Sequence, residues 1–297
     1  MTQTWGSQAN LRDRLVEEAA NLPIGDPLTL VRVARLCEDP FADAREIALH
    51  VQRDAAFAAT LLRLANSAHF SRGRPVGEIV NAITRLGLRL VGSLALATPG
   101  LRMLEHPPGD LEGASRRLHR HAVRSGLAAR LLAPAEDADL ALAAGLIHNI
   151  GLNVVLRADP DRFRRLLATA NSGEQLRDVE VDLMGVTHGE LGGLITERWR
   201  YPLSLITATI DHDLTEPTGL AAAVRLADLI GREAGVGVEA PEEVPDSLFE
   251  RLGYTPEDAR ARLDVVFSAE GRLAAEADGD RKPNGAGGAL ANALDVA

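Results

Sequence analysis

The fold is decided by residues 54–70, which read DAAFAATLLRLANSAHF. Large apolar residues recur there at intervals of three and four, at Phe57, Leu61 and Leu64. This is the period of an α-helix that buries one face. Asp54 stands just before the pattern, where a helix N-cap is expected. The stretch therefore predicts a helix that begins after Asp54 and packs one side against a core.

The same period continues on both sides of this stretch through almost the whole chain. No segment shows the sustained alternation of apolar and polar residues that is typical of a half-buried β-strand. We therefore expect an all-α fold. The expected helices cover residues 11–22, 28–36 with a continuation to 51, 57–65, 79–86, 88–104, 115–132, 137–156, 160–171, 176–184, 187–199, 202–212, 218–232, 248–252 and 256–267.

Turn-forming residues suggest how the chain is divided. Residues 105–113 contain two prolines and two glycines, which is typical of a boundary. We expect a short N-terminal extension at 1–14 and a two-lobed module at 15–232, with lobes at 15–106 and 110–232. A C-terminal helical extension should follow at 233–270. Residues 271–297 are rich in Gly, Ala and Asp and are expected to be a disordered tail.

Composition restricts the possible partners. The chain of 297 residues has a formal net charge of −10, which argues against attraction to nucleic acid or to anionic lipid. The single cysteine, Cys37, excludes an intrachain disulfide and a multi-cysteine zinc site. Residues 1–18 show no signal peptide, and the longest apolar run, 90–101, is too short to span a bilayer. We expect a cytoplasmic protein with no membrane partner.

Four histidines and one aspartate lie on expected helices of the second half: His121, His148, His188, His212 and Asp228. Helices that each direct such a side chain to one centre are how helical bundles bind metal ions. Alternatively, each histidine is a core residue that hydrogen-bonds to the backbone or to another histidine. Neighbouring glycines either permit close helix packing or leave room for a ligand: Gly145, Gly151, Gly192 and Gly193.

Three motifs resemble one known family. The first is LRLANSAHF at 62–70, followed by Ala-Ile at 82–83 and Leu-Gly at 86–87. The second is His-Arg-His at 119–121 with GLIHNIG at 145–151, and the third is His188 with Gly192 before Glu-Arg-Trp at 197–199. In this order they resemble the HDOD family, the HD-related output domain of bacterial signalling proteins. The resemblance covers roughly residues 15–232 and implies a two-lobed helical module related to the HD phosphohydrolases.

The resemblance also implies a metal site. In the wider superfamily the ligands are a His, a His-Asp doublet and a distant Asp. The matching positions here are His121, the doublet His148-Asn149 and Asp228, and the extra histidines of some branches match His188, as a further ligand, and His212. These residues imply at most a single divalent metal ion as cofactor.

Two departures from the family pattern argue against turnover. Asn149 stands where the doublet carries an aspartate, and a neutral amide is a weaker metal donor than a carboxylate. Leu152 stands where many active enzymes carry a lysine near the substrate phosphate, so we expect the site to lack that cation.

The resemblance with these departures implies a non-catalytic module of signal transduction, in which no residue is assigned a catalytic role. It would act through a protein partner, in a pathway that could involve cyclic dinucleotides, because related modules occur beside domains of that kind. The alternative is a metal-dependent phosphohydrolase with an altered His-Asn site.

Overall fold

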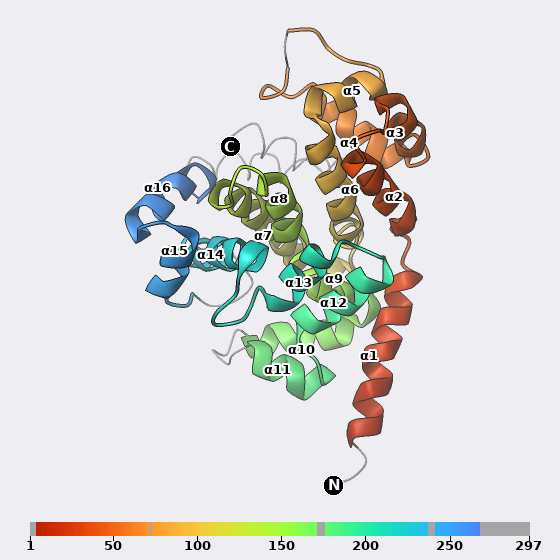
Figure 1. Ribbon diagram of the computed structural model, residues 1–297. Coiled ribbons are helices and arrows are strands. Elements are labelled where there is room, and N and C mark those ends of the chain that lie inside the picture. The colour runs from red at the N-terminus through yellow and green to blue at the C-terminus, as the bar shows by residue number, and fades with distance from the viewer. Residues whose placement is uncertain (1–3, 72, 171–175, 237–240, 268–297) are drawn as a thin grey trace.

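The computed structural model describes residues 4–71, 73–170, 176–236 and 241–267. Over these residues the chain is built from α-helices and contains no β-strand, which confirms the all-α prediction (Figure 1). The core is mainly aliphatic, as the low aromatic content requires. The tail expected to be disordered, residues 271–297, lies outside the described residues.

Six helices make up the N-terminal part: α1 (Thr4–Ala20), α2 (Pro27–Glu38), α3 (Ala44–Val51), α4 (Ala55–Ala65), α5 (Ile79–Leu86) and α6 (Leu88–Arg102). The side chains of Asp26, Asp43 and Asp54 each accept a hydrogen bond from a first-turn amide. The predicted start at Asp54 is therefore confirmed. The expected continuation from α2 to residue 51 is wrong, because Pro40 interrupts the chain there and Asp43 caps a separate helix.

The second part begins with a short 3-10 turn, Gly109–Leu111, that leads into α7. Its helices are α7 (Glu112–Leu132), α8 (Ala138–Ile147), α9 (Ile150–Ala158), α10 (Pro160–Ala170), α11 (Leu176–Met184), α12 (His188–Arg198), α13 (Leu203–Asp211) and α14 (Gly219–Glu233). The chain continues with α15 (Asp246–Leu252) and α16 (Pro256–Phe267), which pack against α14 and α7. In Figure 1, α7 and α8 lie at the centre of the molecule with the other helices around them.

The two predicted lobes share one continuous set of buried apolar residues. The helix α6 packs on α2 on one side and on α8 on the other, and so connects them. The predicted boundary between residues 14 and 15 lies inside α1, which is a single helix. This helix packs against α9, α11 and α12 (Figure 1). The division into lobes at 15–106 and 110–232 stays a prediction.

One expected helix is broken at a position that matters for the site. Periodicity predicts a single helix over residues 137–156, but a turn at His148 and Asn149 separates α8 from α9. The ring Nδ1 of His148 lies 2.7 Å from the carbonyl oxygen of Gly145. In a regular helix that carbonyl would accept from the amide of Asn149. The histidine side chain thus takes the place of a backbone donor, and the helix opens there.

The glycines of this region permit close packing, which decides between the two interpretations left open above. A Cβ atom on Gly145 would lie 2.6 Å from the Cα of Gly126, and one on Gly151 would lie 2.0 Å from the carbonyl oxygen of His188. Cβ atoms on Gly192 and Gly193 would meet side chains of α13 at 2.7 and 2.4 Å. Neighbouring helices therefore fill the space beside these glycines.

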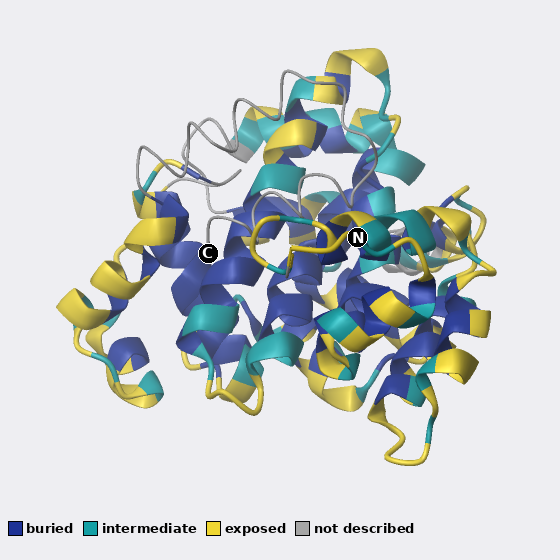
Figure 2. Ribbon diagram, turned by 90° about the horizontal axis from the view of Figure 1, so that it is seen from above, coloured by how far each residue is buried: buried dark blue, intermediate teal, exposed yellow. Residues whose placement is uncertain are grey.

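Burial separates the inner helices from the outer ones. Figure 2 shows the buried residues gathered in the middle of the molecule, with exposed residues on the outer helix faces and loops. The stretch Ala138–Ala158, which contains α8 and α9, has the length and hydropathy of a membrane span. However, 89% of its apolar window is buried inside the protein, as in the core helices of a folded domain.

Candidate metal centre

Three predicted ligands converge from three different helical segments. His121 comes from the middle of α7, His148 from the turn between α8 and α9, and Asp228 from the middle of α14. The Nε2 atoms of the two histidines are 3.1 Å apart, and His121 Nε2 lies 3.2 Å from Asp228 Oδ1. One ligand atom from each residue lies within 4.8 Å of the other two. These three of the five residues assigned to the site converge, whereas His188 is not part of the group. Their binding of a metal ion stays a prediction.

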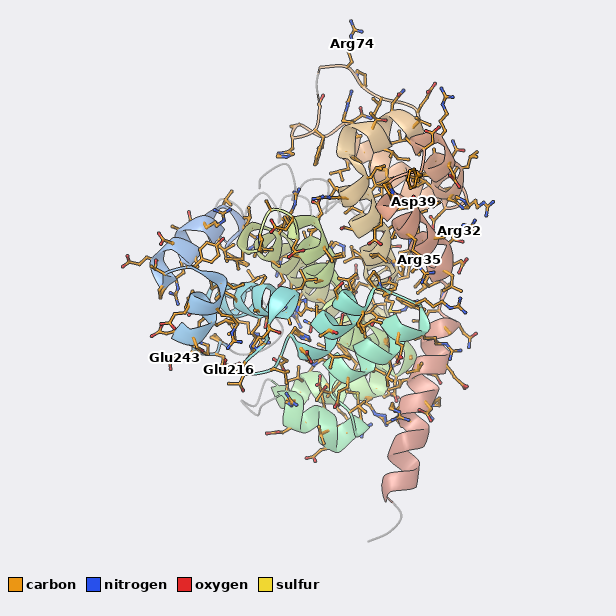
Figure 3. The ribbon with its side chains drawn as sticks, viewed as in Figure 1. Arg32, Arg35, Asp39, Arg74, Glu216 and Glu243 are labelled. Atoms are coloured by element: carbon orange, nitrogen blue, oxygen red, sulfur yellow. The ribbon has the colours of Figure 1, made fainter. Side chains whose placement is uncertain are left out.

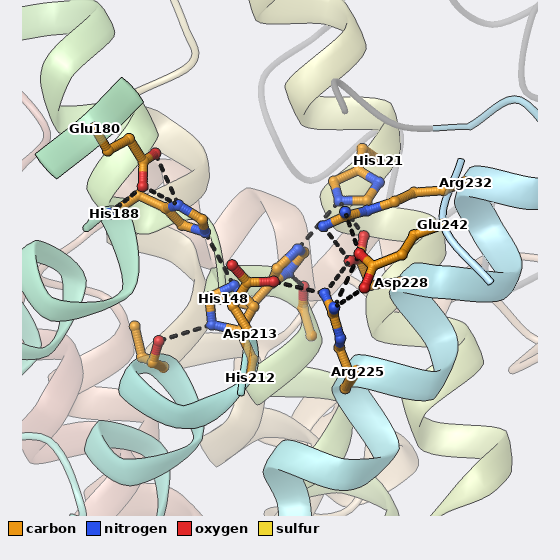
Figure 4. A network of polar contacts seen from close by, with 12 residues as sticks. His121, His148, Glu180, His188, His212, Asp213, Arg225, Asp228, Arg232 and Glu242 are labelled. Carbon is orange, nitrogen blue, oxygen red and sulfur yellow. Dashed lines mark hydrogen bonds and ion pairs between the residues drawn. The ribbon is translucent and has the colours of Figure 1, made fainter. Parts of the chain in front are cut away.

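The other two histidines form a second pair beside the first. His188 begins α12 and His212 follows α13, and their Nε2 atoms are 3.1 Å apart. The rings of His148 and His212 have centroids 5.0 Å apart, so the four imidazoles form a continuous row. Figure 4 shows this row with a buried carboxylate at each end, Asp228 beside His121 and Glu180 beside His188.

Hydrogen bonds at the outer ring nitrogens orient most of these imidazoles. Nδ1 of His148 faces the carbonyl of Gly145, and Nδ1 of His212 faces the carbonyl of Thr209 at 2.8 Å. A carbonyl only accepts, so these Nδ1 atoms carry the protons and the Nε2 atoms present lone pairs to the centre. His188 Nδ1 lies 2.8 Å from the Glu180 carboxylate. Such outer partners are typical of metal-binding histidines.

The donor atoms fit a metal ion. Two ligand atoms on one ion with bonds of about 2.1 Å lie roughly 3.0–3.4 Å apart, depending on the geometry. The separations of 3.1 and 3.2 Å among His121, His148 and Asp228 agree with this. Asn149 contributes a further observation, because its Oδ1 is buried and accepts no hydrogen bond from any described residue. Two imidazoles with a carboxylate suit Zn²⁺, Fe²⁺ or Mn²⁺.

The pKa values of His148, His212 and Asp228 are shifted toward the protonation states that bind a metal ion. Burial, together with the charges of His121 and His212, lowers the pKa of His148 well below its ordinary value. Burial and the charge of His188 lower the pKa of His212 to about 4. For Asp228, burial opposes ionisation, but the charge of Arg232 and the hydrogen bond from His121 hold its pKa well below the usual range. At neutral pH His148 and His212 are therefore neutral and Asp228 is ionised.

Two arginines that the sequence motifs do not include lie at the same aspartate. Arg232 Nη2 is 2.6 Å from Asp228 Oδ2, and Arg225 Nη1 is 3.8 Å from the same oxygen. Both side chains are buried. Leu152 carries no charge, as the sequence shows, but two cations from α14 lie at the centre instead. The signal was present, because residues 225, 228 and 232 recur at helical spacing on the apolar helix α14.

Two further carboxylates complete the charge balance around Arg225. Its Nη1 donates to Asp213 Oδ1 at 2.5 Å, and its Nη2 donates to both carboxylate oxygens of Glu242 at 3.0 Å. Asp213 follows His212 directly, so the second histidine pair and the arginines are linked through adjacent residues (Figure 4). Neither carboxylate could be assigned from sequence, because each comes from a loop outside the motifs.

A family model of the HDOD domain matches residues 25–214. An uncharacterised protein of Treponema pallidum (strain Nichols) is 29% identical over 260 residues, which are 83% of this chain and 48% of that protein. The chain thus spans about half the length of that relative.

Solved structures share the fold. A protein from Marinobacter aquaeolei VT8, named for a proposed role in signal transduction, has a TM-score of 0.72 at 23% identity, over 91% of this chain and 66% of that one. An HDOD domain protein of unknown function from Geobacter sulfurreducens has a TM-score of 0.68 at 22% identity, over 98% of both chains. A protein from Shewanella amazonensis SB2B, named as a proposed phosphohydrolase, has a TM-score of 0.60 at 20% identity, over 96% and 98% of the two chains. Since the family model covers well over half of the sequence, the chain belongs to the HDOD family.

Proposed function

We propose that this chain is a cytoplasmic regulatory module of signal transduction that carries one divalent metal ion and acts by binding a protein partner. The observation that carries the proposal is the burial of the centre. His121, His148, His188 and His212 are 1–2% exposed and Asp228 is 0% exposed. A substrate would have to open the helix packing to reach them, whereas a metal ion that stabilises the packing would not.

The donor set supports a metal ion with a structural or regulatory role. His121, His148 and Asp228 would hold it, with Asn149 beside them as a neutral donor. When bound in related phosphohydrolases such an ion polarises a phosphoryl oxygen. Here the asparagine leaves the centre with one carboxylate fewer than a His-Asp doublet would supply, which favours a single ion and weak activation of water.

The proposal is tested by measuring the metal content of the protein and of two variants. Protein purified without chelator should contain about one divalent ion per chain by elemental analysis, and His121→Ala should lose most of it. His119→Ala removes the histidine two positions earlier on the same helix and serves as the matched control, which should keep the ion. Absence of any ion from the unaltered protein, or equal loss in both variants, would refute the metal centre.

A second candidate function is supported by the two arginines at Asp228. Guanidinium groups beside a metal are suited to neutralise a phosphoryl group, as a metal-dependent phosphohydrolase requires. The test is turnover of phosphomonoesters and cyclic dinucleotides by metal-loaded protein. Steady turnover that His148→Ala abolishes would establish this function and overturn the non-catalytic proposal. No turnover with the ion present is the expected result.

A further inference from the structure

The stretch of chain from α4 to α6 has an excess of positive charge. Residues 55–104 contain six arginines and a single carboxylate, that of Glu78. The remainder of the chain beyond this stretch has the opposite sign, because residues 105–297 contain 20 basic and 32 acidic side chains. A chain with a net charge of −10 thus has a positive region confined to a few helices of its N-terminal part.

The arginines of this stretch differ from those elsewhere in their partners. Among the described residues of the stretch, only Arg102 forms an ion pair, with the capping carboxylate of Asp54 at 2.7 Å. In the second part of the chain, surface arginines such as Arg164 and Arg260 each lie beside a carboxylate, at 2.7 and 3.1 Å. The other arginines between α4 and α6 therefore keep a positive charge that faces solvent.

Backbone hydrogen bonds place three of these arginines on adjoining segments. Arg85, in the last turn of α5, donates from Nη1 to the carbonyl of Ala65 at 3.1 Å and from Nη2 to the carbonyl of Arg74 at 2.8 Å. Ala65 ends α4, and Arg63 stands two residues before it on the same turn. We call Arg63, Arg74 and Arg85 the arginine face. Arg63 and Arg74 are exposed, and Arg85 is half-buried.

The loop that carries Arg74 is anchored at its base. Asn66 donates from Nδ2 to the carbonyl of Val76 and accepts at Oδ1 from the amide of Val76, both at 2.8 Å. With Arg85, this pair of bonds fixes the two ends of the loop, and in Figure 3 the side chain of Arg74 projects away from the molecule. A partner that binds there has less chain to order, because the loop ends are already fixed.

We propose that the arginine face is a docking surface for a carboxylate-rich segment of a protein partner, in which acidic and apolar residues are mixed. Guanidinium groups pair with carboxylates through two parallel hydrogen bonds. Partly buried apolar residues accompany the arginines on α4, the loop and α5, and they suit apolar side chains of the segment: Leu62, Val76 and Val80. The inference deepens the proposed function, and it rests on that function in one respect, that the partner is a protein.

The distribution of charge favours a short acidic segment over nucleic acid. Attraction between exposed charges decays over about 8 Å at physiological salt. A nucleic-acid strand carries its charge well beyond three arginines, and the neighbouring stretch, residues 27–54, contains four arginines and five carboxylates. It would therefore meet repulsion outside the arginine face, whereas a short protein segment ends within it.

The test is binding of a fluorescein-labelled peptide of four Glu-Glu-Leu repeats to the full chain, measured by fluorescence anisotropy at low ionic strength. The peptide should bind saturably, and added salt should weaken it. Arg63→Glu on α4 and Arg74→Glu on the loop should each weaken binding about five- to tenfold, because each replaces an attraction by a repulsion. Thermal unfolding shows that the variants are folded.

Arg177→Glu is the matched control. Arg177 is an exposed residue of α11, which lies at the opposite end of the molecule from α4 and α5 in Figure 1. The substitution changes the net charge by the same amount as Arg63→Glu, so it measures the effect of overall charge. The peptide should bind this variant as tightly as the unaltered protein. Equal weakening by Arg63→Glu and Arg177→Glu overturns the proposal.

Two further probes test the chemistry of the partner. A peptide of four Gln-Gln-Leu repeats should not bind, because it lacks the carboxylates. A single-stranded oligonucleotide of the same charge should bind more weakly than the acidic peptide. The proposal is overturned if the acidic peptide does not bind, if the glutamine peptide binds equally well, or if the oligonucleotide binds more tightly and loses affinity in Arg63→Glu.

These titrations are carried out with chelator present, so their outcome does not depend on the metal centre. Failure of the acidic peptide to bind removes the arginine face as a docking surface and leaves the metal content of the protein as found. Absence of the metal ion removes the metal centre and leaves the peptide binding as found. The two proposals therefore fail separately.

Discussion

At the scale of single residues, Asn149 sets the charge of the centre. It follows His148 in the turn between α8 and α9, it is buried, and its Oδ1 has no hydrogen-bond donor among the described residues. A buried acceptor without a partner costs free energy unless a ligand or a water molecule satisfies it. At the proposed ion, a neutral side chain would bind more weakly than a carboxylate, and this difference is open to a direct test.

Replacement of Asn149 by aspartate should strengthen metal binding. An added carboxylate should raise the affinity for a divalent ion about tenfold, and it should lower the stability of the metal-free protein because a buried charge lacks a partner. Calorimetric titration with Mn²⁺ or Zn²⁺ and thermal unfolding in chelator measure the two effects. Asn153→Asp, one turn further along α9 and also buried, should lower stability without any gain in affinity. Equal metal affinity in both variants would contradict the placement of Asn149 at the ion.

The ionised side chain of Asp54 stabilises the folded protein by an amount that depends on pH. It caps α4 through the amide of Phe57, and its two oxygens accept from Arg102 at 2.7 Å each. Burial opposes ionisation, but the hydrogen bonds from Arg102 and Phe57 leave the pKa of Asp54 below its ordinary value. A lowered folded-state pKa means stability that is present above the unfolded pKa near 4 and is lost as the pH falls through the folded value.

Asp54→Asn should therefore destabilise the protein by about 2 kcal/mol at pH 7, because asparagine keeps the cap but leaves Arg102 without its charge partner. The difference from the unaltered protein should shrink as the pH falls below about 4. Urea unfolding between pH 7 and pH 3 measures it. Asp26→Asn, at the cap of α2 that contacts Leu28 and Thr29, should show a much smaller difference. If the difference in free energy of unfolding between Asp54→Asn and the unaltered protein stays constant over this pH range, the ion pair contributes nothing to stability.

At the scale of helices, close packing of α9 on α12 positions the second histidine pair. The Cα of Gly151 lies so near the carbonyl of His188 that there is no room for a side chain. His188 is the first residue of α12, and Thr187 and Glu190 form a capping box that fixes where this helix begins. The position of one imidazole is thus set by a glycine on a neighbouring helix.

Gly151→Ala should destabilise the protein by about 3 kcal/mol, because the new methyl group would overlap the His188 carbonyl and force the two helices apart. Gly113→Ala is the control. Its Cβ would meet only Arg117 Nη1 at 3.9 Å, and alanine favours the helix by about 1 kcal/mol. Denaturant unfolding of both variants measures the effects, and the two should have opposite signs. If Gly151→Ala left the free energy of unfolding unchanged, α9 and α12 would be able to move apart at no cost.

At the scale of the whole molecule, α6 connects the N-terminal helices to the histidine-bearing helices. The hydroxyl group of Tyr201, after α12, donates to the carbonyl of Leu96 on α6 at 2.5 Å, and Asn153 of α9 donates to the carbonyl of Gly100. The guanidinium of Arg35 on α2 donates to the carbonyl of Arg200. These contacts and the shared core predict that both parts unfold together.

Tyr201→Phe should lower the stability of the entire chain by about 1 kcal/mol, because the carbonyl of Leu96 loses its hydrogen-bond donor while the ring stays in place. In scanning calorimetry the single unfolding transition should shift down by about 2 °C. Tyr254→Phe, at a less buried ring, should leave the transition unchanged. Two separate transitions, with only one shifted, would show instead that the two predicted lobes unfold independently.

The helical class, the capped helix starts and the choice of His121, His148 and Asp228 as candidate ligands follow from the amino-acid sequence alone. Helix period and N-caps are local properties of the chain, and the ligands lie in motifs that resemble those of a known family. Periodicity fails at residues 137–156, where it indicates one helix and the chain forms two. The break there depends on a side-chain hydrogen bond that no pattern of apolar residues reveals.

What the sequence left open were contacts between residues far apart in the chain. Arg225 of α14 meets Asp213 and Glu242 from two other segments, and Gly151 of α9 meets His188 of α12. Burial also distinguishes the carboxylates at the arginines, because Asp228 is almost completely buried and the side chain of Glu242 is 44% exposed. Local physics thus specified the helices and the ligand types, whereas packing between helices decided their distances, charges and access to solvent.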